Sequence, residues 1–142
     1  MQGHVVTFLS FDSSADWAGF AVLLFLAILF LQSGLDKVFD RKGNLEYLSG
    51  HFAHSPLSGL TPLLFLCITI LEVGTGVLAL LGAAVFAFSG GTALAVAASF
   101  AAVATFLALF LGQRLAKDYA GAAALVPYFL VGVAGILLTQ AM

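Results

Sequence analysis

Four long apolar stretches dominate this sequence, and they restrict its fold more than any other feature. They cover about residues 17–35, 60–81, 91–111 and 119–138. Each holds roughly 19 to 22 residues, and at about 1.5 Å of rise per residue a helix of that length crosses a hydrocarbon layer of about 30 Å. A membrane-spanning strand would alternate polar and apolar residues, and these stretches do not. The pattern predicts an all-α, polytopic membrane protein with a four-transmembrane-helix bundle.

Composition excludes a soluble domain of this size. The chain has 142 residues, of which 62% are hydrophobic and 8% are charged, whereas about 25% of residues in soluble proteins are charged. A small globule has too much surface for its volume to hide that much apolar area. We therefore expect a single membrane domain over 1–142, with the lipid bilayer as its first partner. No basic run is long enough to bind nucleic acid, so no nucleic-acid partner is expected.

The basic residues are confined to two connections between the apolar stretches. Three follow the first stretch and two follow the third, and with four crossings these connections lie on one side of the membrane. The positive-inside rule makes that side cytoplasmic and places both termini on the non-cytoplasmic side. The topology-setting residues are Lys37, Arg41, Lys42, Arg114 and Lys117.

The connection between the first and second apolar stretches is the longest. Within it, Leu45, Leu48 and Phe52 are spaced so that they would line one face of a helix. One hypothesis is a short amphipathic helix at the membrane interface, ending before Pro56. The other is an irregular polar loop.

An acid lies in the middle of the second apolar stretch. Glu72 is about 12 residues into it, which is roughly 18 Å along a helix and near the bilayer midplane. An acid at that depth costs about 2.5–3.5 kcal/mol on insertion scales, so we expect Glu72 to face the bundle interior. It is either a proton-handling or ligand-binding acid, or a structural acid that is protonated or hydrogen-bonded.

Few polar residues are placed to meet Glu72. Gln32 lies near the end of the first stretch, and Tyr128 lies in the fourth, roughly 5 Å from the level of Glu72 along the axis. Pro127 lacks a backbone donor and favours a kink beside Tyr128. Glu72, Tyr128 and Gln32 therefore form the candidate intramembrane polar site. The alternative is an ordinary kink in which the backbone satisfies Tyr128.

Metal and thiol chemistry have little support. His51 and His54 lie at i and i+3 and are the candidate metal ligands, but no third ligand is evident, so no metal site is predicted. The single cysteine, Cys67, excludes an internal disulfide, a CxxC pair and a cysteine-based zinc site. We expect Cys67 to be a packing residue.

Two motifs resemble the DoxX-like family of small four-helix bacterial membrane proteins. The segment 33–37, SGLDK, resembles the family's GLxK signature, and the segment 71–78 resembles its acid followed by small residues. Gly34, Lys37 and Glu72 map onto this pattern, and none is an established catalytic residue by that mapping. The resemblance implies the bacterial inner (cytoplasmic) membrane and a link to quinone-coupled oxidation of sulfur compounds. A quinone is then the candidate cofactor, and none is expected to be bound covalently.

Two classes of function follow. The first is an accessory or structural subunit of a respiratory or quinone-linked redox complex, with other membrane subunits or a second copy of the chain as partners and no catalytic activity of its own. The second is a quinone- or proton-handling oxidoreductase component, or a small-molecule transporter, that uses Glu72. The lack of a cysteine pair argues against thiol–disulfide catalysis.

Overall fold

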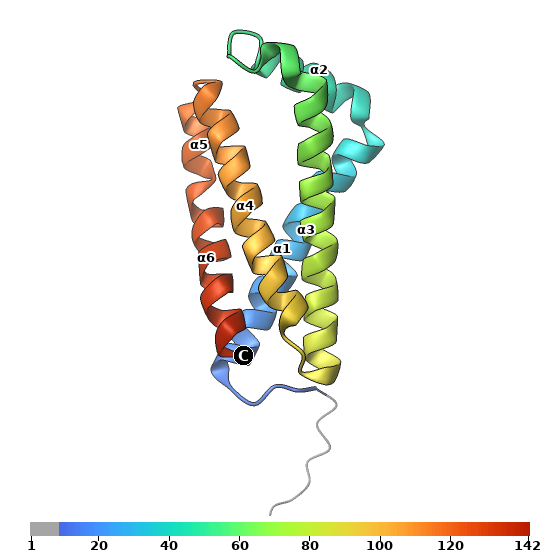
Figure 1. The fold of residues 1–142 in the computed structure, drawn as a ribbon, viewed down its shortest axis with the longest axis vertical. Helices are drawn as coiled ribbons and strands as arrows, with labels where there is room; N and C mark the ends of the chain where they lie inside the picture. Colours follow the sequence, from blue (N-terminus) through green and yellow to red (C-terminus); the bar gives the residue numbers. More distant parts are fainter. Residues whose placement is uncertain (1–8) are drawn as a thin grey trace, which may run out of the picture.

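The computed structural model describes residues 9–142, and no strand occurs among them. Four helical spans are long and apolar enough to cross a membrane: Ser14–Phe39, Ser58–Ser89, Ala93–Leu115 and Tyr119–Ala141. The prediction of an all-α, multi-pass four-helix bundle is confirmed (Figure 1). The elements are α1 (Ser14–Phe39), α2 (Arg41–His51), η1 (Ser58–Leu60), α3 (Thr61–Ser89), α4 (Ala93–Leu115), α5 (Tyr119–Ala124) and α6 (Val126–Ala141).

The first helix begins earlier than residue 17 because a capping box fixes its start. The Ser13 hydroxyl accepts the backbone N–H of Asp16 at 3.2 Å, and the Asp16 carboxylate accepts the backbone N–H of Ser13 at 3.0 Å. Two backbone donors that the helix itself leaves unpaired are satisfied in this way.

The α3 helix, which corresponds to the second apolar stretch, continues through residues 82–89. The apolar pattern assigned these residues to the connection between the second and third stretches. That assignment is wrong, because the segment is rich in alanine and apolar residues that continue a helix readily. The helix stops at Gly90, whose φ of 77° is left-handed and suits glycine. The turn to α4 is therefore only residues 90–92.

The connection after α1 contains a helix, α2, so the irregular-loop alternative is wrong. Asp40 joins the two helices. Its backbone N–H donates to the Asp36 carbonyl, and its carboxylate accepts the N–H of Gly43 in the first turn of α2. Leu45 and Leu48 are half-buried, and Phe52 is buried.

The fourth span is broken as its proline suggested. α5 ends at Ala124, Leu125 forms a turn, and α6 begins at Val126 with Pro127 in its first turn. Pro127 has no N–H to bond to the carbonyl four residues earlier, so the helix is interrupted at this point.

The spans form a closed ring in which α1 packs on α3, α3 on α4, α4 on α6, and α6 on α1. Six of the ten residues of the buried core are alanines, whose small side chains let helices pack closely in lipid. The α2 helix, the start of α3 and the end of α4 lie at one end of the bundle, opposite the C-terminus (Figure 1). The core residues are Leu23, Leu26, Ala27, Phe30, Ala79, Ala83, Ala95, Ala98, Ala102 and Phe106.

Candidate functional site

A buried ion pair joins α1 to α3. The Lys37 Nζ lies 2.9 Å from the Glu72 Oε2, and the Glu72 side chain is only 3% exposed. The Ser33 hydroxyl donates to the Glu72 Oε1 at 3.1 Å, and the Lys37 ammonium donates to the Ser33 Oγ at 3.1 Å. The three side chains therefore form one compact polar cluster.

The backbone geometry brings this cluster together. Ser33 and Lys37 are one helical turn apart, so they lie on the same face of α1. Between them, Gly34 lies so close to α3 that a Cβ there would meet the Val73 backbone nitrogen at 2.9 Å. Glycine is needed for that approach, and the approach lets the side chains flanking it reach Glu72.

The pair neutralises a charge that would otherwise be isolated in an apolar setting. A buried carboxylate without a partner is strongly unfavourable, and a nearby ammonium offsets that penalty. The Glu72 Oε2 nevertheless has no hydrogen-bond partner among the described residues. Its 2.9 Å contact with the Lys37 Nζ is an ion pair.

The structure gives Glu72 different partners from those that the sequence suggested. Tyr128 packs its ring near Phe106 and Phe25, with ring centroids 6.2 Å apart in each case, and it is not among the hydrogen-bond partners of Glu72. Gln32 is exposed on α1. The three residues of the candidate polar site are therefore not brought together.

Ser33 and Lys37 are the functional candidates that the sequence reasoning missed. Lys37 was assigned only to topology and to a family motif. The available signal was the i, i+4 spacing of Ser33 and Lys37 at the end of an apolar helix, in a chain with one intramembrane acid.

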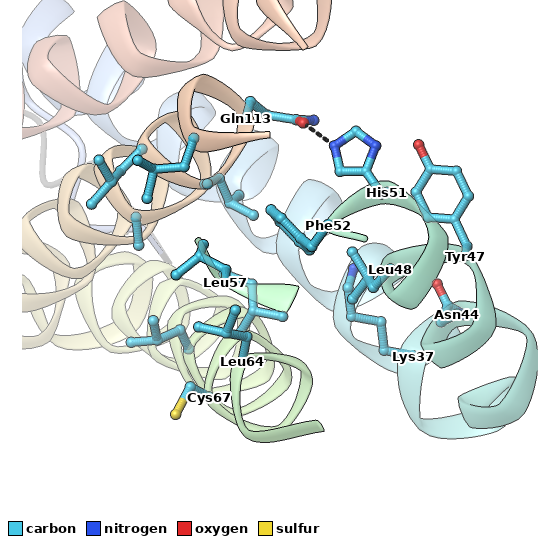
Figure 2. Close-up of a pocket in the computed structure, with 17 residues that line it drawn as sticks. Lys37, Asn44, Tyr47, Leu48, His51, Phe52, Leu57, Leu64, Cys67 and Gln113 are labelled. Carbon is cyan, nitrogen blue, oxygen red and sulfur yellow. Dashed lines mark hydrogen bonds between the residues drawn. The ribbon is translucent and has the colours of Figure 1, made fainter. Parts of the chain in front are cut away.

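A cleft of about 380 Å³ lies between α2, α3 and α4, next to this cluster. Its long walls are apolar side chains of α3 and α4, such as Ile68 and Leu109. Polar side chains gather where α2 closes the cleft, as Figure 2 shows. These polar residues are Lys37, Asn44, Tyr47, His51 and Gln113.

His51 connects α2 to the end of α4 across the cleft. Its Nε2 lies 2.6 Å from the Gln113 Oε1, a contact drawn as a dashed line in Figure 2. The Asp118 Oδ2 lies 3.8 Å from the same nitrogen. The ring stacks on Tyr47, with centroids 5.6 Å apart, and meets Phe52 edge-on. His51 is thus held on several sides, and its hydrogen bond holds α2 over the cleft.

His54, a candidate metal ligand, and Cys67, the expected packing residue, belong to no metal-binding group within residues 9–142. His54 is exposed beyond the end of α2, and residues 9–142 contain no group of three or more histidine, cysteine or acidic side chains placed to hold a metal. Cys67 is exposed and lines the cleft, so the prediction that it is a packing residue is wrong.

The remaining predicted residues fall at one end of the bundle. Arg41 and Lys42 begin α2, and Arg114 lies in the last turn of α4 with its guanidinium 4.4 Å from the centre of the Tyr119 ring. Lys117 follows in the turn to α5, with a left-handed φ of 58°. The basic residues therefore share one end of the bundle. They follow the first and third spans, and the two spans that separate these positions return the chain to the same end.

These features define the class of the protein: a multi-pass helical membrane protein with a buried Ser–Lys–Glu cluster beside a cleft. Comparison with protein-family models, curated proteins and solved structures finds no match to the chain.

Proposed function

We propose that this chain is a quinone-binding component of a membrane redox system. The cleft between α2, α3 and α4 takes the quinone from the surrounding lipid. The observation that carries this proposal is the arrangement of the cleft: apolar walls along the helices, and hydrogen-bonding side chains at the end beneath α2.

The size and walls of the cleft suit the ring and the first part of a quinone tail. Its volume of about 380 Å³ falls in the usual range of roughly 300–1,000 Å³ for small-molecule sites. Cys67, Leu71 and Leu111 line the cleft and are exposed, so the cleft is open at the surface of the bundle. Because the outside of a membrane bundle meets lipid, an apolar ligand has a lateral route into the cleft.

The polar end supplies hydrogen-bond donors for ring carbonyl oxygens. Tyr47 has a hydroxyl, and Gln113 keeps its amide hydrogens because its Oε1 contacts His51. A quinone carbonyl accepts hydrogen bonds and carries no charge, so both donors suit it. The apolar tail then lies along α3 and α4 and extends into lipid.

The resemblance to DoxX-like proteins supports the same proposal, because founding members of that family are linked to quinone-coupled oxidation. We place the chain in the bacterial inner membrane, with its basic end in the cytoplasm and its termini outside. Residues 1–8 lie outside the described part of the chain. A role as an accessory or structural subunit, with other membrane subunits or a second copy of the chain as partners, stays a prediction, because an apolar outer face suits lipid as well as a partner helix.

The single cysteine makes the proposal testable. Cys67 lines the cleft and is the only thiol of the chain. With the protein in lipid nanodiscs, decylubiquinone should slow alkylation of Cys67 by N-ethylmaleimide, followed by mass spectrometry. The ring of decylubiquinone is fully substituted, so it does not add to the thiol.

A matched pair of α4 variants tests where the quinone binds. Ala108 lines the cleft and Ala104 does not, although both are exposed alanines one turn apart. Ala108→Phe fills the cleft and should abolish protection by decylubiquinone, whereas Ala104→Phe should leave it unchanged. Equal alkylation of the wild-type chain with and without decylubiquinone would overturn the proposal.

A further inference from the structure

The cleft and the buried ion pair share one residue, Lys37. From this arrangement we infer that Glu72 sets the charge of the ligand that the cleft accepts, and that it restricts the cleft to ligands with an uncharged head. The inference rests on the proposed function because both use the same cleft. It concerns the charge of the ligand head, which is a separate property from its quinone chemistry.

Among the described residues that line the cleft, Lys37 is the one lysine, arginine, aspartate or glutamate. Its ammonium is 2.9 Å from the carboxylate of Glu72, which is nearly fully buried and does not itself line the cleft. Ser33 binds both members of the pair. A ligand in the cleft therefore meets a Lys37 side chain whose positive charge is already paired with the carboxylate of Glu72, outside the cleft.

This balance opposes anionic ligands. An anionic head would have to compete with Glu72 for the ammonium, and success would leave the buried carboxylate without its counter-charge. An uncharged head needs no such exchange, because it leaves the pair intact. The neutral quinone ring fits this requirement, whereas a carboxylate or sulfonate head does not.

Removing the charge of Glu72 should reverse the preference. In Glu72→Gln, the Lys37 ammonium loses its counter-ion but stays beside a cleft with mostly apolar walls, where electrostatic attraction is stronger than in water. An anionic head would then supply the missing charge. Glu72 is thus a specificity-determining residue that acts through Lys37.

The experiment compares two amphiphiles with the same tail, undecanol and undecane sulfonate. Each is titrated against the full chain in zwitterionic nanodiscs, with protection of Cys67 from N-ethylmaleimide as the readout. Wild type should be protected by undecanol in preference to the sulfonate. In Glu72→Gln the half-protecting concentration of the sulfonate should fall roughly tenfold or more, while that of undecanol changes little. The double variant Lys37→Met with Glu72→Gln should lose this gain.

A second acid at the same end of α1 provides the matched control. Asp36 is exposed and belongs to a separate hydrogen-bond group with Asn44, so Asp36→Asn changes the net charge of the chain equally without unpairing Lys37. It should leave sulfonate protection as in wild type. An equal gain in Asp36→Asn, or no gain in Glu72→Gln, would overturn the inference.

Different results contradict the proposal of quinone binding and the inference about Glu72. Absence of protection by decylubiquinone in the wild-type chain overturns quinone binding and leaves the sulfonate comparison between variants intact. If Glu72→Gln does not fold, the wild-type preference for undecanol over the sulfonate still decides the matter, because a chain protected equally well by the sulfonate contradicts the inference.

Discussion

Gly34 on α1 lies directly against the backbone of Val73 on α3. A Cβ on Gly34 would sit 2.9 Å from the Val73 nitrogen and 3.3 Å from the Glu72 Cβ. This approach sets the separation of the two helices at the level of the ion pair. It is the reason that Ser33 and Lys37, on either side of Gly34, reach Glu72 with ordinary side-chain lengths.

Alanine at Gly34 should push the two helices apart. We expect Gly34→Ala to lower the free energy of unfolding by about 1–3 kcal/mol, the usual range for an overpacked contact. Gly74→Ala is the matched control, since a Cβ there meets nothing within 4 Å, and it should be neutral or stabilising. Reversible unfolding in mixed SDS micelles measures both. Equal effects of the two changes would show that the approach at Gly34 is not tight.

The ion pair should appear as a coupling between its two members. Lys37→Met or Glu72→Gln alone leaves one polar partner unmatched in the bundle, whereas the double variant removes both charges. We expect a double-mutant cycle on the free energy of unfolding to give a coupling of about 0.5–3 kcal/mol. Strictly additive single effects would mean that the 2.9 Å contact contributes nothing to stability.

A hydroxyl pair between α3 and α4 should contribute a smaller amount. The Thr75 and Thr105 Oγ1 atoms lie 3.2 Å apart, and both side chains are buried. Thr75→Val should lower the free energy of unfolding by about 0.6 kcal/mol and at most about 1.7, the measured range for such bonds in membranes. Thr69→Val is the control, since its hydroxyl bonds to the Phe65 carbonyl of its own helix. A larger loss in the control would refute the assignment.

His51 should hold α2 in place over the cleft. Its contact with Gln113 is lost in His51→Phe, although the ring can still stack on Tyr47. We expect amide hydrogens of residues 44–52 to exchange about tenfold faster in this variant, equivalent to loss of about 1.4 kcal/mol of local protection. His54→Phe, at an exposed position, should leave the exchange rates unchanged. Hydrogen exchange with mass spectrometry measures both, and unaltered α2 protection in His51→Phe contradicts the role.

The orientation of the bundle is testable with thiols at its two ends. Ser49 lies on α2, Gln140 lies near the end of α6, and both are exposed. The α2 helix and the C-terminus lie at opposite ends of the bundle (Figure 1). In a Cys67→Ser background, an impermeant maleimide added to intact cells should label Gln140→Cys and spare Ser49→Cys until the cells are opened. The reverse pattern would invert the membrane orientation while leaving the fold intact.

Local patterns were enough to predict the spans. Apolar runs of bilayer length, the spacing of Leu45, Leu48 and Phe52, and the proline in the fourth span each act over a few turns of one helix. The structure has a helix or a break at each of these places. The misplaced end of the second span has a local cause as well, because apolar residues beyond Gly82 continue the helix and only Gly90 ends it.

The partner of Glu72 depends on how two helices are offset along their axes. The sequence placed Glu72 by counting from the start of its own apolar stretch. The span Ser58–Ser89 has 32 residues, about 48 Å of helix, which exceeds a hydrocarbon core of about 30 Å. Position along so long a helix does not give depth in the membrane, so Lys37, near the end of α1, was not recognised as lying at the same level.

From the sequence alone the chain could be predicted to be helical, to have four spans long and apolar enough to cross a membrane, and to gather its basic residues at one end, because these properties follow from the composition and order of single segments. Only the tertiary structure decided that Ser33, Lys37 and Glu72 form one cluster beside a cleft. Contacts between segments depend on helix separation and axial offset, and here both are set by a close approach at Gly34 that no single-segment pattern contains.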